Sequence, residues 1–187
     1  MGVGVGWMKE EFEAVGRPWD NRGSRADETL EVFKVLFEDD LSSYEGTWTS
    51  FRDIGFSPKP VKNHIPVWVG GHSAAAFKRT AVFGDAFHAA FPSPDLLSQQ
   101  WAEVAEACDI VGRDSRELEL TSLFRLNFDG GNLDEGEIGG STEQVIDQIG
   151  RYEEVGLTHA AFFVLGRGNE RRLEAINRFA EDIAPNF

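Results

Sequence analysis

The chain has 187 residues, 41% of them hydrophobic, and a formal net charge of −14 at pH 7. A chain of this length buries on the order of 70% of its unfolded surface, so we expect one folded domain spanning residues 1–187. The acidic charge and the absence of any run of five or more basic residues argue against nucleic-acid and anionic-membrane partners, because neutralising phosphate requires clustered cations.

The number of cysteines and the N-terminal sequence indicate in which cellular compartment the protein is expected. Cys108 is the only cysteine, which excludes an intrachain disulfide and a cysteine-rich zinc site and favours a reducing compartment. The four histidines are scattered along the chain, so no metal site is predicted. No apolar run approaches the roughly 20 residues of a membrane span, and Met1-Gly2-Val3 carries neither a basic leader nor a myristoylation signal. We therefore expect a cytoplasmic protein that is neither exported nor anchored.

The N-terminal region begins with an apolar strand, residues 2–6, that runs into the glycine turn Gly4-Val5-Gly6-Trp7. Only about four residues precede this turn where a strand commonly has five or six, so the chain is expected to begin inside a strand. Helices are predicted at 9–15 and 24–38, and the second has a buried stripe formed by Leu30, Phe33 and Phe37.

Residues 39–65 interrupt this pattern and are predicted to form a covering loop. Tyr44-Glu45-Gly46-Thr47 is suited to a hairpin turn, whereas Pro58, Pro60 and Pro66 prevent regular ladder pairing around the end of the segment.

From Pro66 onward, strands and helices alternate. We predict strands at 66–70, 85–91, 118–128 and 158–165, and helices at 74–83, 94–111, 142–155 and 170–183. This order predicts an α/β fold with a parallel sheet. The strands that contain Val67-Trp68-Val69 and Ala160–Val164 are continuous apolar runs, which is typical of strands covered by helices or packed in a barrel.

Capping residues support these boundaries. Ser73 and Ser93 precede predicted helices, Gly84 and Gly112 end them, and Ser141 with Gln144 has the spacing of a capping box. The helix at 94–111 has one apolar face, formed by Leu97, Trp101, Val104, Cys108 and Val111. Residues 129–140 are glycine-rich and acidic but do not match the EF-hand template, so we predict a mobile loop there.

The turn Gly70-Gly71-His72-Ser73, between a strand and a helix, is the strongest candidate site. Two glycines and a serine at a helix start leave backbone N–H groups facing outward beside the positive end of the helix dipole, which is how proteins bind phosphate. His72 lies within this turn and has a ring N–H able to donate to a phosphate oxygen. The opening Gly2-x-Gly4-x-Gly6 lacks the spacing of a dinucleotide fingerprint and is a weak signal alone.

Other side chains receive structural interpretations. His88 and His159 lie in strands and are predicted to be satisfied structural histidines, and Arg79 is expected to pair with Asp85 or face solvent without a chemical role. No nucleophile elbow, HExxH motif or Walker loop is present, so hydrolase, zinc-protease and NTPase functions have no support.

Taken in order, several motifs resemble the bacterial luciferase-like monooxygenase family, most closely its F420-dependent oxidoreductase branch. They are Gly2–Trp7 followed by Glu11-Phe12 and Gly16, Arg22-x-x-Arg25-x-x-Glu28, Gly46, Pro58-Lys59-Pro60, Pro66–Ser73 and Gly84-Asp85-Ala86-Phe87. In the last motif the family usually has Asp-Gly-Trp. The resemblance implies part of a (β/α)8 barrel, matching strands 4 to 8 with their helices and lacking three βα units.

The resemblance also implies a cofactor site. Gly70, Gly71, His72 and Ser73 would hold the cofactor phosphate, and Val5-Gly6-Trp7 would line the ring or ribityl side. Coenzyme F420 is the implied cofactor, with hydride transfer to or from a small organic substrate, and FMN in a monooxygenase is the alternative. A non-catalytic flavin-binding homologue or an inactive fragment is the third reading. The catalytic residues stay unknown, because the family places several of them on the first three strands, which this chain lacks. We also expect the protein to form a homodimer.

Overall fold

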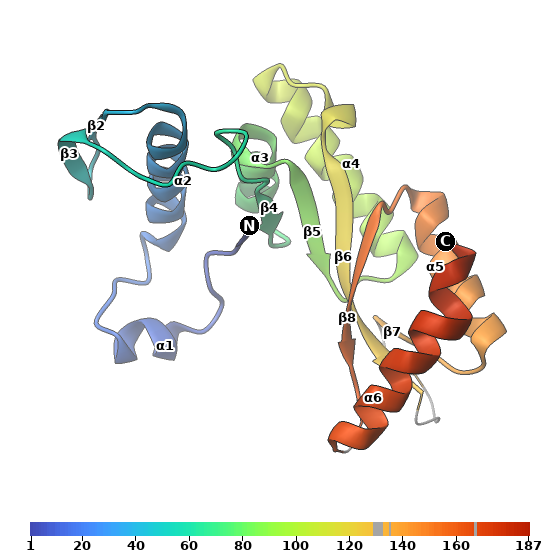
Figure 1. The fold of residues 1–187 in the computed structure, drawn as a ribbon. Coiled ribbons are helices and arrows are strands. Elements are labelled where there is room, and N and C mark those ends of the chain that lie inside the picture. Colours follow the sequence, from blue (N-terminus) through green and yellow to red (C-terminus); the bar gives the residue numbers. More distant parts are fainter. Residues whose placement is uncertain (129–132, 135, 167) are drawn as a thin grey trace.

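The computed structural model describes residues 1–128, 133–134, 136–166 and 168–187. Its main sheet is parallel throughout, and its strands run in the order β1 (Gly2–Val3), β4 (Trp68–Gly70), β5 (Ala86–Ala90) and β6 (Glu119–Asn127). Both β7 (Glu137–Gly139) and β8 (His159–Val164) pair with β6. The predicted α/β architecture is confirmed, and the curved sheet corresponds to part of a barrel (Figure 1).

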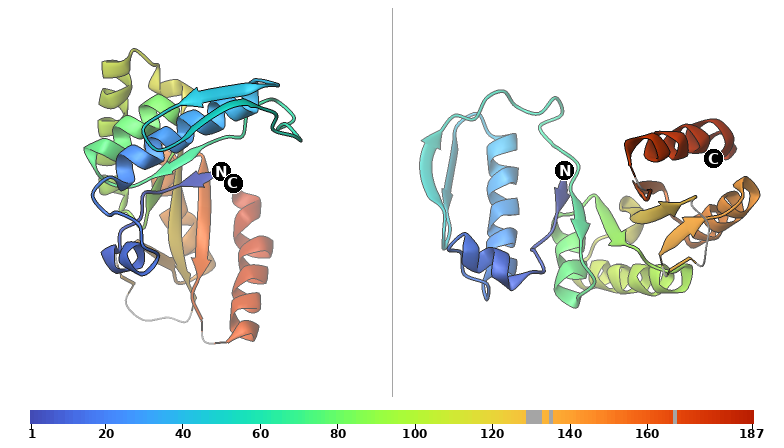
Figure 2. Two further views of the ribbon diagram at one scale, coloured as in Figure 1. Left: turned by 90° about the vertical axis from the view of Figure 1, so that its left-hand side faces the viewer. Right: turned by 90° about the horizontal axis from the view of Figure 1, so that it is seen from below.

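The helices alternate with these strands, as the sequence predicts. They are α1 (Lys9–Ala14), α2 (Arg22–Glu38), α3 (Ala74–Phe83), α4 (Pro94–Val111), α5 (Thr142–Val155) and α6 (Asn169–Arg178). Short helical turns at Ser115–Glu117, Phe179–Ile183 and Ala184–Asn186 complete the described elements. Seen from below, α3, α4 and α5 follow one another along the outside of the sheet (Figure 2). No described helix has the length and apolar character needed to cross a membrane.

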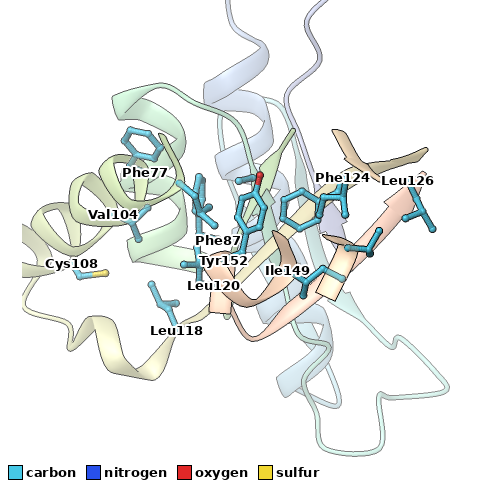
Figure 3. Packing of buried hydrophobic residues seen from close by; sticks show 14 of the residues in the cluster. Phe77, Phe87, Val104, Cys108, Leu118, Leu120, Phe124, Leu126, Ile149 and Tyr152 are labelled. Carbon is cyan, nitrogen blue, oxygen red and sulfur yellow. The ribbon is translucent and has the colours of Figure 1, made fainter. Parts of the chain in front are cut away.

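The main core lies between the sheet and this outer layer of helices (Figure 3). Phe87, Leu120 and Phe124 project from the strands, and Val104 and Tyr152 from the helices. Cys108 is fully buried, as its place on the apolar face of α4 predicts. Val111 of the same predicted face is 40% exposed, because it is the last residue of α4, where the chain turns away at Gly112.

Serine caps begin three of the helices. The Oγ atoms of Ser73 and Ser93 each accept a hydrogen bond from a backbone N–H three residues later, at 3.3 Å in both cases. Ser141 and Gln144 form the predicted capping box. Gly112 and Gly156 end α4 and α5 in the left-handed conformation, which a residue with a Cβ adopts only at a cost in free energy.

Residues 39–65 contain an antiparallel hairpin, β2 (Ser42–Glu45) and β3 (Ser50–Ile54), and its ladder ends before the first proline of the segment. The hairpin turn is tied to α2 by Glu28, whose carboxylate accepts hydrogen bonds from the backbone N–H groups of Thr47 at 2.8 Å and Trp48 at 2.9 Å. Burial raises the pKa of Glu28, but these hydrogen bonds outweigh burial and lower the pKa below its usual range. An ionised Glu28 therefore joins α2 to the hairpin.

Two expectations about strand boundaries are wrong. The first strand is predicted at 2–6 but ends at Val3, because the chain leaves the ladder at Gly4 and adopts a positive φ of 79° at Gly6. Glu137–Gly139 form β7 within the segment predicted as a loop, because they continue along β6 beyond the end of β5. Residues 129–132 and 135 of that predicted loop lie outside the described residues.

Candidate functional site

The two glycine junctions of the sequence meet at one edge of the sheet. Strand β1 pairs in parallel with β4, and Val3 lies opposite Val69, so both chains leave the sheet at neighbouring positions. We call the edge formed by the C-terminal ends of the strands the carboxyl edge. Gly4-Val5-Gly6-Trp7 follows β1 there, and Gly70-Gly71-His72-Ser73 ends β4 and opens α3.

The two glycines of the second junction differ in how strictly the backbone requires them. Gly71 has a φ of +133°, and a Cβ there would lie 2.8 Å from the Cβ of Ala76. Gly70 is different, since a Cβ there would make only ordinary contacts, 3.6 Å from the His88 carbonyl oxygen and 3.7 Å from that of Val3. The protein's own packing therefore does not require glycine at position 70, and the missing side chain leaves the turn open to an approaching ligand.

The turn also presents backbone hydrogen-bond donors at the start of α3. Among the described residues, none accepts a hydrogen bond from the backbone N–H groups of residues 72–75, whereas the next N–H in α3, that of Ala76, donates to Ser73. These donors lie at the positive end of a helix of 10 residues, beside the exposed side chains of His72 and Ser73. The geometry fits a phosphate group of a cofactor, which prefers backbone N–H groups at a helix start.

The first junction contributes a bulky apolar group. Gly6 packs against Phe12, since a Cβ at Gly6 would lie 2.6 Å from the ring of that residue. Val5 is half-buried and Trp7 is 81% exposed. That these residues line a cofactor ring stays a prediction. They follow β1, which pairs with β4, the strand that leads into the turn Gly70-Gly71-His72-Ser73.

A polar layer crosses the sheet at the level of Gly70. His88, Thr121 and His159 lie in register on neighbouring strands, on the face opposite the core. The Thr121 hydroxyl donates to the Phe87 carbonyl at 3.0 Å, so the 2.8 Å bond between Thr121 Oγ1 and His88 Nδ1 requires the imidazole to donate. We assign the proton to Nδ1 from this network, which leaves Nε2 as an acceptor.

The environment favours the neutral form of this imidazole. Burial, and secondarily the charge of His159, lower the pKa of His88. The ring of Trp68 lies 5.5 Å from that of His88 and 4.8 Å from that of His159. His88 is thus held on one side, as a structural histidine would be, but no described residue bonds its Nε2. A signal for this position was present in the sequence, because the alternation of residues along the predicted strand directs His88 to the face opposite the core.

The expected partner of Arg79 is wrong. Arg79 is buried, and its Nε donates to Asp27 Oδ1 of α2 at 2.5 Å while Nη2 donates to the Gly23 carbonyl at 3.2 Å. Asp85 instead accepts from the Val67 N–H and lies 2.9 Å from His64 Nε2. Arg79 and Asp27 are 52 residues apart, so no local pattern in the sequence connects them.

A large groove lies at the opposite end of the sheet. It has a volume of about 830 Å³ and is lined by Leu30, Phe33, Val67, Asp85 and Arg113, among others, from α2 and the segments that precede β4, β5 and β6. In parallel α/β folds, ligands bind beyond the carboxyl ends of the strands. We therefore place the candidate site at the glycine turns, where the N–H groups of residues 72–75 have no acceptor among the described residues. No group of three or more metal-ligating side chains occurs among the residues that the structure describes.

Several curated proteins are similar in sequence to parts of this chain. A Mycobacterium tuberculosis protein, Rv0940c, is 31% identical over 131 residues, which is 70% of this chain and 45% of that protein. An FMNH2-dependent dimethylsulfone monooxygenase of Pseudomonas putida is 37% identical over 75 residues, 38% of this chain and 21% of the enzyme. The match covers between 21% and 59% of the length of these and a further curated relative, Rv0953c of Mycobacterium tuberculosis.

Solved structures share the fold. An F420-dependent secondary alcohol dehydrogenase, solved with an F420-acetone adduct, superposes with a TM-score of 0.82 at 18% identity, covering 97% of this chain and 68% of the dehydrogenase. The family model described as luciferase-like monooxygenase matches residues 1–130, which include both glycine junctions. The chain therefore belongs to the luciferase-like monooxygenase family.

Proposed function

We propose that this protein is an F420-dependent oxidoreductase that transfers a hydride to or from a small organic substrate. The observation that carries the proposal is the turn Gly70-Gly71-His72-Ser73, next to the Val5-Gly6-Trp7 junction. At this turn, the backbone N–H groups at the start of α3 have no acceptor among the described residues. The fold shared with an F420-dependent dehydrogenase supports this cofactor. The dimethylsulfone monooxygenase relative favours FMN as the second candidate.

In this proposal each junction has a separate task. Backbone N–H groups of residues 72–75 and the Ser73 hydroxyl donate to the cofactor phosphate, and His72 donates from its ring. Val5, Gly6 and Trp7 line the ring or ribityl side and keep water from it. F420, when bound, supplies or accepts the hydride. The protein's part is to bind and orient both reactants. Neither a catalytic residue nor a metal is assigned.

A titration with matched ligands tests the phosphate assignment. Quenching of tryptophan fluorescence is followed as FMN, riboflavin and F420 are added to the purified chain. Since riboflavin differs from FMN in lacking the phosphate, loss of charge-assisted hydrogen bonds worth about 1.5–3 kcal/mol predicts that FMN binds at least tenfold more tightly. Tighter binding of F420 than of FMN would support the F420 assignment, and the reverse order would support the monooxygenase.

Equal affinity for FMN and riboflavin would refute the phosphate site. Binding of none of the three would favour an inactive fragment. Light scattering on the same samples tests the homodimer that we propose, and a mass equal to that of one chain would refute it.

A further inference from the structure

Arg125 lies at the carboxyl edge of the sheet, on the face opposite the core. Its neighbours Phe124 and Leu126 are buried against the helices, so the alternation of the strand directs Arg125 to the other face. There it lies in register with Phe163 of β8 and Glu137 of β7. Phe163 is 56% exposed on this face.

Within the part of the chain that the structure describes, no acidic side chain neutralises the positive charge of Arg125. No carboxylate of the described residues lies within 4.0 Å of its guanidinium group, whereas Arg79 and Arg113 have such partners. The Glu137 carboxylate is engaged elsewhere, with the Asn127 amide at 3.2 Å and the Asp134 N–H at 3.4 Å. A half-buried guanidinium with no counter-ion among the described residues has the charge and the donor geometry to bind an anion.

Phe91 holds the guanidinium in place. The Cζ atom of Arg125 lies 3.8 Å from the centroid of the Phe91 ring, in a cation–π contact. Phe91 has a φ of +55°, a conformation that costs a bulky residue of order 1–3 kcal/mol. Its position is fixed by a 2.8 Å hydrogen bond from its N–H to the Leu123 carbonyl and by the close backbone of Gly136. Such strain concentrates where a ligand is held.

Arg125 lies apart from the turn Gly70-Gly71-His72-Ser73, to which we assign the cofactor phosphate. Strand β5 lies between β4, which delivers the turn, and β6, which carries Arg125. With neighbouring strands about 4.8 Å apart, the two strands are separated by roughly 10 Å. One phosphate does not span that distance, so the two anion sites serve different groups.

We propose that Arg125, with Phe91 and Phe163, binds the carboxylate of an organic substrate that also has an apolar portion. The guanidinium fork pairs with the two carboxylate oxygens, and the two aromatic rings contact the apolar portion. This inference rests on the proposed function, because the substrate half of the site is defined relative to the cofactor turn.

Calorimetric titration with 4-phenylbutanoate and its neutral counterpart 4-phenylbutan-1-ol tests the proposal on the full chain. Wild-type protein is expected to bind the acid at least tenfold more tightly than the alcohol. Arg125→Met keeps the apolar stem against Phe91 and removes the charge, so this preference disappears, whereas Arg125→Lys retains part of it. Arg52→Met, at an exposed position in the hairpin, is the matched control and leaves the preference unchanged.

Equal binding of acid and alcohol to wild type, or an unchanged preference in Arg125→Met, would overturn the proposal. Weaker FMN or F420 binding in Arg125→Met, with melting temperature retained, would assign the charge to the cofactor and also overturn it. Failure of both cofactors to bind the wild type, with acid preference intact, would refute the proposed function alone.

Discussion

Replacing Ser73 with alanine separates the helix-capping role that the structure shows for this side chain from the phosphate-binding role that we propose for it. The Oγ atom accepts a hydrogen bond from the Ala76 N–H at 3.3 Å, and losing such a helix cap costs about 1 kcal/mol. For a chain of this length, that change lowers the melting temperature by about 2–4 °C. If the hydroxyl also donates to the cofactor phosphate, the loss of a charge-assisted hydrogen bond weakens binding by roughly tenfold to a hundredfold.

Ser93→Ala is the matched control, because Ser93 caps α4 at the same distance of 3.3 Å but belongs to a different junction. Melting followed by circular dichroism is expected to show similar losses of stability in both variants. Fluorescence titration with FMN and F420 should show weaker binding only in Ser73→Ala. Equal affinity in the two variants would refute the reasoning, since the hydroxyl of Ser73 would then act only as a cap.

Three further changes test other contacts. Gly71→Ala is expected to cost about 1–3 kcal/mol by chemical denaturation, because the residue has a φ of +133° and its new Cβ would crowd Ala76; an unchanged midpoint would contradict this strain. The pKa of Glu28 is lowered from 4.5, so the hydrogen bonds of the hairpin are stable above that pH and are lost as the pH falls through the lower folded value. Amide exchange in the hairpin should therefore accelerate below pH 4.5, and a rate independent of pH after intrinsic correction would oppose this. Asp27→Asn should cost about 1–3 kcal/mol by leaving the buried Arg79 guanidinium without its counter-ion, and adding Arg79→Met should restore part of that loss; additive losses would argue against a direct pair.

Local signals predicted much of the fold. The helix boundaries at 74–83, 94–111 and 142–155 agree with the structure because serine caps and terminal glycines mark them within the sequence. Strand ends were less predictable. A ladder ends where its partner ends, and nothing near Val3 or Glu137 in the sequence specifies those partners.

The site was predictable to a similar degree. The glycine turn at residues 70–73 is visible in the sequence because its chemistry is local, and the structure adds the backbone donors at the start of α3 and the neighbouring junction. The tautomer of His88 depends on Thr121, which is 33 residues away in the sequence. Arg79 and its partner Asp27 are 52 residues apart, so local sequence patterns do not connect either pair. Arg125 had a usable signal, since it alternates with buried residues in its strand. Only the three-dimensional structure shows that no acidic side chain of the described segments pairs with it.

The serine-capped starts of α3, α4 and α5 have a kinetic consequence. All three follow strands that end at the carboxyl edge, so their positive dipole ends gather on one rim of a strongly acidic protein. An anionic ligand is repelled by the protein at long range and attracted at this rim at short range. Added salt screens the long-range repulsion first, with a Debye length near 10 Å at 0.1 M. Moderate ionic strength should therefore speed association with such a ligand, the reverse of ordinary electrostatic steering.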